Sequence, residues 1–131
     1  KGFLYKVSDL MLADKEKLPI AHENDKFTDV IELITQYKLG MAMILDNSGV
    51  LTGVLTDGDI RRTLLKYHDT SNLLIKEVMT QNPKRISPDS YGASALNLME
   101  KYSITALAVV DENSRPVGVI HIHDLLKAGV A

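Results

Sequence analysis

The chain has 131 residues, of which 45% are hydrophobic and 24% are charged, with a formal net charge of −2 and no cysteine. This length is enough for one compact domain or two intimate halves with a shared core, and the nearly balanced charge gives no electrostatic reason to expect nucleic-acid binding. The lack of cysteine excludes disulfides and thiolate metal sites, and it fits a cytoplasmic protein.

The longest strictly apolar stretches, Met41 to Leu45 and Ala106 to Val110, are far too short to span a bilayer. The first residues also lack the apolar region of a signal peptide. We therefore expect no membrane partner. The chain starts with lysine instead of methionine, which we interpret as a sign that it is a fragment of a longer protein.

The first strong pattern in chain order predicts a helix over residues 28–39. Its apolar residues recur at the i, i+3, i+4, i+7 spacing of one buried stripe, and the same stripe returns later in the chain. The two sets are Val30, Leu33, Ile34 and Tyr37, and then Ala95, Leu98, Met99 and Tyr102.

Two pairs of strands are predicted after these helices. The continuous apolar runs 41–45 and 106–110 favour strands that are buried on both faces. Turn-forming residues follow each run and lead into residues 50–55 and 116–120, which we expect to pair back as hairpins. The polar stretch 67–74 is then the predicted connector between the two halves.

The chain repeats itself once. Gly53 to Ile60 is answered by Gly118 to Leu125, a shift of 65 residues that also superposes Asp46 on Asp111. A unit that recurs only once is not a solenoid, which needs three or more copies. We therefore predict an α/β (α+β) fold of two pseudo-symmetric βαββα repeats packed as one pair, with residues 1–67 and 68–131 as the two repeats. The seam between such halves is a natural place for a ligand.

The segment Thr56-Asp57-Gly58-Asp59 stands where a strand ends and a helix begins. A helix N-terminus presents unpaired N–H groups and partial positive charge, so a phosphate can bind there. Thr56 offers a hydroxyl donor and Gly58 permits close backbone approach, while the Asp59 carboxylate suits a vicinal diol such as a ribose. Arg61 and Arg62, with Lys66 a turn later, could supply charge to a phosphate.

The same four residues also fit a purely structural role. Thr56-x-x-Asp59 matches a helix capping box, in which threonine is the N-cap and an acid follows three residues later. The second copy, His121-x-x-Asp124, lacks the capping hydroxyl and keeps the aspartate. We interpret an acid that is kept without its capping partner as having a second role, although acids favour helix starts in any case.

His121 and His123 suggest a metal site, since residues i and i+2 on a strand face the same way and Asp124 could be a third ligand. Three closely spaced groups rarely make a closed metal site, so we favour the alternative. In that alternative, His121 contacts a phosphate in the place of Thr56, and His123 makes a surface or inter-subunit hydrogen bond. The chain has no nucleophile elbow, Gly-rich phosphate loop or His-Glu-x-x-His helix. We expect neither catalytic residues nor a metal.

The duplicated βαββα pattern with Gly-hydrophobic-x-Thr-x-x-Asp resembles a tandem pair of cystathionine β-synthase (CBS) domains, a Bateman module. The resemblance covers essentially the whole chain, from Val7 to Leu126. Val78-Met79-Thr80-Gln81-Asn82-Pro83 is similar to the opening of many CBS domains. Leu39 to Met41, Thr56 to Arg62 and His121 to Val130 resemble the C-terminal part of bacterial D-arabinose-5-phosphate isomerases.

This resemblance implies a regulatory segment without catalysis of its own. The parent would interconvert D-ribulose 5-phosphate and D-arabinose 5-phosphate for the biosynthesis of Kdo and lipopolysaccharide, and its catalytic domain would be missing here. No cofactor is required. The implied ligand-binding residues are Met41, Ala42, Thr56, Asp57, Gly58, Asp59 and Arg62 in the first repeat and Thr105, Ala106, His121, His123 and Asp124 in the second.

The expected effector is a nucleotide or nucleotide-sugar: CMP-Kdo or another cytidine nucleotide, or alternatively AMP or ATP. The expected assembly is a homodimer of CBS pairs within a homotetrameric cytoplasmic parent. A second hypothesis is a purely structural dimerisation module with no bound nucleotide. A third is a small metal-dependent enzyme that uses His121, His123 and Asp124.

Overall fold

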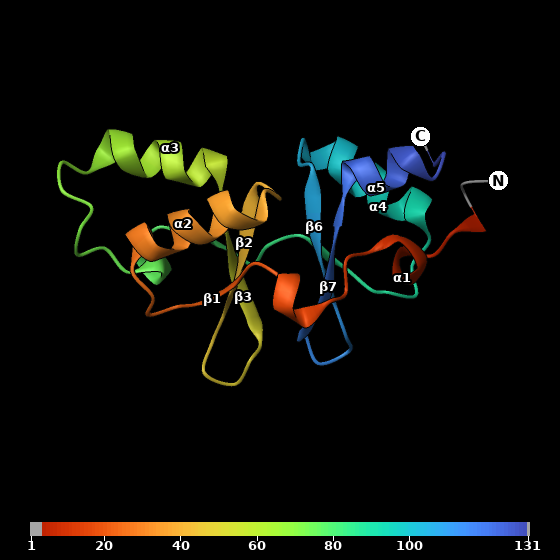
Figure 1. Ribbon diagram of the computed structural model, residues 1–131, viewed down its shortest axis with the longest axis horizontal. Coiled ribbons are helices and arrows are strands. Elements are labelled where there is room, and N and C mark those ends of the chain that lie inside the picture. Colours follow the sequence, from red (N-terminus) through yellow and green to blue (C-terminus); the bar gives the residue numbers. More distant parts are fainter. Residues whose placement is uncertain (1–3, 131) are drawn as a thin grey trace. The chain divides into compact units, whose positions relative to one another are not determined.

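The computed structural model describes residues 4–130 of the chain, which form two compact units (Figure 1). We call Pro19–Pro83 the continuous unit, because it is one uninterrupted segment. We call Lys1–Leu18 together with Lys84–Ala131 the split unit. Each unit contains its own sheet and its own hydrophobic core.

The continuous unit has a four-stranded sheet in the order β1-β2-β3-β4. Strands β1 and β2 are parallel, whereas β3 is antiparallel to both β2 and β4. Its elements in chain order are β1 (Ile20–His22), α2 (Phe27–Tyr37), β2 (Met41–Leu45), β3 (Leu51–Thr56), α3 (Asp57–Lys66), the 3₁₀ turn η3 (Ile75–Glu77) and β4 (Thr80–Gln81).

The split unit repeats this arrangement with a three-stranded sheet in the order β5-β6-β7. Strand β5 is parallel to β6, and β7 is antiparallel to β6. Its elements are α1 (Val7–Leu10), the 3₁₀ turn η2 (Lys15–Lys17), β5 (Arg85–Ile86), α4 (Gly92–Tyr102), β6 (Ala106–Val110), β7 (Pro116–His121) and α5 (Ile122–Lys127). An isolated bridge from Leu12 to Val119 extends this sheet at the edge of β7.

The predicted βαββα order is confirmed in both units, as are the hairpins and the two apolar strands at 41–45 and 106–110. All five residues of β2 are buried. Helix α2 is shorter than predicted, because Lys38 and Gly40 adopt positive φ angles of 59° and 73°. The left-handed backbone at Lys38 ends the helix at Tyr37.

The first three positions of each helical stripe form part of the two cores. Val30 and Ile34 are buried in the core of the continuous unit, and Ala95 and Met99 in that of the split unit. The last position of each stripe lies at the edge: Tyr37 is half-buried, and Tyr102 is 40% exposed. The ring of Tyr102 lies beneath the ammonium of Lys84 at 4.3 Å, in a cation–π contact.

The first residues of each sequence repeat pack with the other repeat. Met79, near the start of the second repeat, belongs to the continuous unit, and Met11, near the start of the first, belongs to the split unit. Met79 lies over Gly53 so closely that a Cβ there would overlap its sulfur atom, and Met11 lies over Gly118, where a Cβ would be 2.7 Å from Met11 Sδ. The compact units therefore begin and end at residues 18–19 and 83–84. The predicted division between residues 67 and 68 concerns the two sequence repeats, not the compact units, and it stays a prediction.

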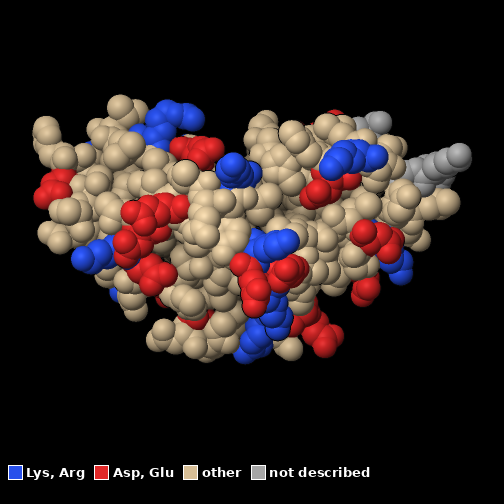
Figure 2. Space-filling model, viewed as in Figure 1, with Lys and Arg blue, Asp and Glu red and all other residues tan. Residues whose placement is uncertain are grey.

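Among residues 4–130 no helix is both long and apolar enough to cross a membrane. On the face drawn in Figure 2, small groups of acidic and basic side chains lie interspersed, so that neither sign forms one large field. This distribution matches the small net charge of the chain.

Candidate ligand-binding junctions

The first junction lies where β3 ends and α3 begins. Thr56 has extended backbone, with φ −116° and ψ 170°, and is the N-cap of α3. The strand register pairs Met41 with Thr56 and Ala42 with Leu55, so the start of β2 lies directly beside the junction. The structure thus brings together the residues predicted for the first repeat, although Met41 and Ala42 are themselves buried.

Thr56 and Asp59 form a complete capping box. The N–H of Asp59 donates to Thr56 Oγ1 at 3.3 Å, and the N–H of Thr56 donates to Asp59 Oδ2 at 2.9 Å. The hydroxyl of Thr56 also donates to Asp59 Oδ2 at 3.0 Å. The structural interpretation of the motif is therefore correct, and any ligand role must coexist with it.

The other carboxylate oxygen of Asp59 is occupied as well. Arg62 Nη2 and Thr80 Oγ1 each donate to Asp59 Oδ1 at 2.7 Å. Asp59 is only 5% exposed, so its charge is held inside the unit by four donors. A carboxylate has about four lone-pair positions, and here the protein itself fills them.

A groove of about 240 Å³ adjoins this cluster within the continuous unit. Its walls come from α3, the residue that follows it and the end of the η3 segment, and they carry two cations, two carboxylates and one aromatic ring. The lining residues are Asp59, Arg62, Thr63, Lys66, Tyr67, Glu77 and Val78. Four of these (Thr63, Tyr67, Glu77 and Val78) were not predicted to bind a ligand, because neither periodicity nor spacing connects residues 77–78 with α3.

Gly58 and Asp57 occupy different sides of the first turn of α3. A Cβ at Gly58 would be 3.3 Å from Arg62 Nη1, so the glycine leaves room for the guanidinium to reach back to Asp59. Asp57 is exposed, and its Oδ2 lies 3.8 Å from the position of a Cβ at Gly40. The glycine that was predicted to admit a ligand therefore admits Arg62 in this structure.

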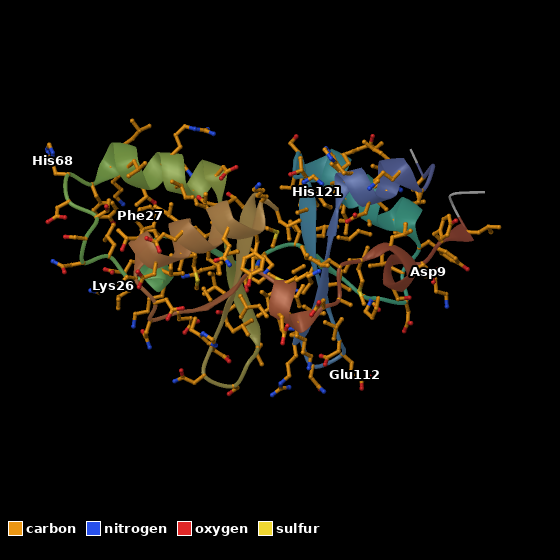
Figure 3. All side chains as sticks on the ribbon, viewed as in Figure 1. Asp9, Lys26, Phe27, His68, Glu112 and His121 are labelled. Atoms are coloured by element: carbon orange, nitrogen blue, oxygen red, sulfur yellow. The ribbon has the colours of Figure 1, made fainter. Side chains whose placement is uncertain are left out.

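The second junction, between β7 and α5, has the same backbone plan. Its N-cap residue, His121, is labelled in Figure 3. The register pairs Ala106 with His121, and the N–H of Ile122 donates to the carbonyl of Thr105 at 2.8 Å. His121 Nδ1 accepts from the N–H of His123 at 3.1 Å, and Asp124 Oδ2 accepts from the N–H of His121 at 2.9 Å. The predicted residues of the second repeat are thus brought together too.

These contacts correct one argument from the sequence. The absence of a capping hydroxyl at His121 suggests, from the sequence, that Asp124 has a second role. The imidazole of His121 takes the place of that hydroxyl, and Asp124 accepts the same backbone N–H that Asp59 accepts in the first repeat. Helix capping alone is therefore a sufficient reason for an acid at this position.

The ring of His121 is partly buried and meets the ring of His123 edge-on, with centroids 4.7 Å apart. Burial lowers the pKa of His121 below its ordinary value and His123 lowers it further, whereas Asp124 acts in the opposite direction. Because Nδ1 accepts a hydrogen bond, the neutral ring carries its proton on Nε2. That N–H is a donor that a ligand phosphate could use.

The metal hypothesis finds no support in the geometry. His121 is the last residue of β7 and His123 lies in α5, so the alternation of strand side chains does not apply to the pair. In the described part of the chain, no group of three or more His, Cys, Asp or Glu side chains is placed to hold a metal ion.

The two junctions differ in the donors around the acid. Lys127 stands in α5 where Arg62 stands in α3. Leu12 bridges to Val119 where Thr80 pairs with Val54, so a leucine replaces the threonine that donates to Asp59. Sequence reasoning missed the role of Thr80, since its contact with Asp59 spans 21 positions.

Comparison with known proteins identifies the class of domain to which these features belong. The CBS domain model matches residues 7–66 and again residues 75–131, so the chain belongs to the CBS domain family and contains two copies of the domain. The expected fold class and the expected resemblance are both confirmed.

The most informative relatives are called arabinose 5-phosphate isomerase KdsD. The chain is 42% identical to the one from Pseudomonas aeruginosa and 37% identical to the one from Escherichia coli K12, over 99% of its own length in both cases. It spans only 40% and 39% of those proteins, respectively.

Solved structures agree with the family assignment. The CBS domain pair of protein MJ0100, in complex with 5′-methylthioadenosine and S-adenosyl-L-methionine, has a TM-score of 0.83 at 26% identity, and the match covers 97% of this chain and 98% of that one. CBSX2 in complex with AMP has a TM-score of 0.81 at 20% identity, with 96% of each chain covered, which shows a common fold.

Proposed function

We propose that this chain is the nucleotide-binding regulatory module of a D-arabinose-5-phosphate isomerase, a cytoplasmic enzyme of Kdo and lipopolysaccharide biosynthesis whose catalytic domain lies outside this segment. The parent activity is suggested by the isomerase relatives, whose similarity extends over nearly the whole of this chain. Ligand binding by the module would act on the attached domain only as far as the ligand prefers one conformation of the protein over another.

The observation that carries the nucleotide proposal is the groove beside the first junction. It places the cations of Arg62 and Lys66 next to a carboxylate, Asp59, within a hollow of about 240 Å³. Two cations suit a phosphate and a carboxylate suits the diol of a ribose, so the lining matches the two polar ends of a nucleotide. Tyr67 adds a ring on which a flat group can stack.

The chemical class we favour is an adenine nucleoside or nucleotide. The support is the MJ0100 domain pair, which is similar to this chain at 26% identity and binds two adenosine derivatives. A cytidine ligand such as CMP-Kdo remains the alternative that end-product control of the pathway would favour, so both bases belong in the test.

Thermal unfolding of the 131-residue chain with AMP, ATP, 5′-methylthioadenosine, S-adenosylmethionine, CMP and CMP-Kdo tests the proposal. A ligand present at 100 times its Kd should stabilise the fold by about 2.7 kcal/mol. At this size, that corresponds to a rise in Tm of roughly 4–8 °C. The absence of any shift with all six compounds at millimolar concentration would contradict the proposal.

A pair of matched variants locates the site. Lys66→Gln removes a cation from the groove, whereas Lys17→Gln makes the same change in charge at an exposed position of η2 in the split unit. We expect the first variant to weaken binding of a phosphorylated ligand about tenfold and the second to leave it within twofold. Equal weakening would mean that only the net charge matters.

A structural dimerisation module is the second candidate, and exposed leucines favour it. Leu64 and Leu65 of α3 are 56% and 83% exposed, and Leu126 of α5 is 50% exposed. We propose that such helices pair two modules in a homodimer, within a homotetrameric parent. Sedimentation of the wild type and of Leu65→Lys tests this assembly: a wild-type dimer that dissociates in the variant supports it, and a monomeric wild type contradicts it.

A further inference from the structure

We infer that the side chain of Arg62 acts as a latch on Asp59. A ligand must displace Arg62 from Asp59 in order to bind, and this exchange makes the junction selective for phosphorylated nucleosides over unphosphorylated ones. The inference rests on the proposed function, because it concerns the same groove. It assigns to Arg62 a part in selectivity that goes beyond supplying positive charge.

The first observation is that Asp59 has no acceptor position left for a ligand. Thr56 occupies Oδ2 through its N–H and its hydroxyl, while Arg62 and Thr80 occupy Oδ1 at 2.7 Å each. A ribose diol brings two further donors. It can therefore bind Asp59 only by exchanging its hydroxyls for donors that are already present.

The second observation identifies the donor that can leave. The N–H and the hydroxyl of Thr56 are both part of the cap of α3, and the hydroxyl of Thr80 is on a short side chain whose backbone pairs with β3. These three donors have little freedom to move away from Asp59. The Arg62 side chain is 69% exposed and reaches Asp59 across Gly58, where a side chain would meet it at 3.3 Å. It is the donor that can move away with the least disturbance of the fold.

The third observation is where the displaced guanidinium would be. Arg62 lines the groove together with Lys66, one turn later on the same helix. A ligand phosphate in the groove gives the released guanidinium a new anion, so that its charge is paired before and after the exchange. A nucleoside without phosphate breaks the ion pair between Arg62 and Asp59 and provides no anion for the released guanidinium.

Selectivity follows from this balance. Adenosine must break the Arg62–Asp59 pair without replacing it, whereas AMP replaces it with a phosphate contact. The wild type should therefore prefer AMP over adenosine by more than the charge of Lys66 alone would give. Without Arg62, adenosine should bind more tightly, and AMP should keep only the advantage that Lys66 gives.

Titration calorimetry with adenosine and AMP on the whole chain tests the latch. Arg62→Gln should strengthen adenosine binding and lower the ratio of AMP affinity to adenosine affinity about tenfold. Arg61→Gln is the matched control, since Arg61 is the preceding exposed arginine of α3 and is not among the residues that line the groove. It should leave the ratio within twofold of the wild type.

Thr80→Val is the complementary variant, because it frees one position on Asp59 Oδ1 and keeps both cations. It should strengthen adenosine and AMP binding by a similar factor and leave their ratio unchanged. A melting curve of each variant confirms that it is folded at the temperature of the titration.

The outcomes separate the latch from the function beneath it. Wild-type binding with the same AMP to adenosine ratio in Arg62→Gln overturns the latch and leaves the proposed function standing, as does an equal fall of the ratio in Arg61→Gln. Binding that is seen only in Arg62→Gln supports the latch in its strongest form, whereas binding that is seen only in Thr80→Val overturns it, because Arg62 still holds Asp59 in that variant. No binding of either compound by any of the four proteins overturns the latch together with the adenine proposal.

Discussion

The two strand-to-helix junctions share a backbone plan and differ in the side chains around one aspartate. Asp59 is 5% exposed and receives four side-chain and backbone donors from Thr56, Arg62 and Thr80. Asp124 is half-buried and accepts the N–H of His121. Duplication has therefore kept the capping geometry, while the surroundings of the acid have diverged.

The comparison shows that the backbone arrangement common to both junctions and the side chains around each aspartate depend on different residues. In both units a methionine packs over a strand glycine, and an antiparallel partner sets the position of the junction. These contacts depend on small and apolar residues that recur in the repeat. The donors around the aspartate come from positions where the repeats differ: Thr80 against Leu12, and Arg62 against Lys127.

The largest expected difference is in the stability lost when each acid is removed. Asp59→Ala should reduce the free energy of unfolding by about 3 kcal/mol, because a helix cap and charge-assisted hydrogen bonds to two side chains are lost together. Asp124→Ala should cost about 1 kcal/mol, which is typical of a helix-capping interaction alone. Urea denaturation of both variants measures the difference, and equal losses would mean that the donors on Oδ1 contribute nothing.

Disrupting the contact between methionine and strand glycine should lower the free energy of unfolding by the same amount in the two units. Gly53→Ala and Gly118→Ala each force a side chain against a packed methionine, Met79 and Met11 respectively, so each should cost about 2 kcal/mol. Denaturation gives the two values. Met79→Ala is expected to relieve part of the loss in Gly53→Ala, and strictly additive losses in that double variant would contradict the contact.

A smaller effect is expected from Thr80 and its counterpart. Thr80→Val removes one hydrogen bond to Asp59 without changing the shape of the side chain, and should cost about 1 kcal/mol. Leu12→Thr places a hydroxyl at the matching position of the split unit, where we expect a change below about 0.5 kcal/mol. A loss in Leu12→Thr as large as that in Thr80→Val would show that the two edges are not equivalent.

The smallest effect is a dependence on pH that only the second junction should show. The pKa of His121 is lowered in the folded chain, mainly by burial, from an ordinary value of 6.5. As the pH falls below that value, the unfolded chain binds a proton that the folded chain does not. Stability is therefore lost from about pH 6.5 downward, until the folded pKa is passed. Protonation also removes the acceptor that caps the N–H of His123.

His121→Thr is the control for this dependence, because threonine is the capping residue of the first repeat. The variant should keep the cap and lose this part of the pH dependence. The measurement is the difference between wild type and variant in unfolding free energy from pH 7.5 to pH 5. Parallel curves would mean that His121 does not cause the dependence.

The sequence predicted the βαββα order, the two buried strands, the hairpins and the positions of both junctions. Those features depend on periodicity and on turn residues, which act over a few positions of the chain. It did not show that Tyr102 makes an exposed contact with Lys84. The pattern also does not show that an imidazole can cap a helix in place of a hydroxyl, so the missing hydroxyl at His121 is no argument for a second role of Asp124.

The amino-acid sequence by itself therefore determined the elements, their duplication and the family to which the chain belongs. The tertiary structure decided which segments pack together and which donors form hydrogen bonds to the carboxylate at each junction. Thr80 reaches Asp59 across 21 positions only because β4 pairs with β3 at the edge of the sheet. Local patterns fix local structure, whereas the surroundings of a buried carboxylate depend on segments that meet only when the chain folds.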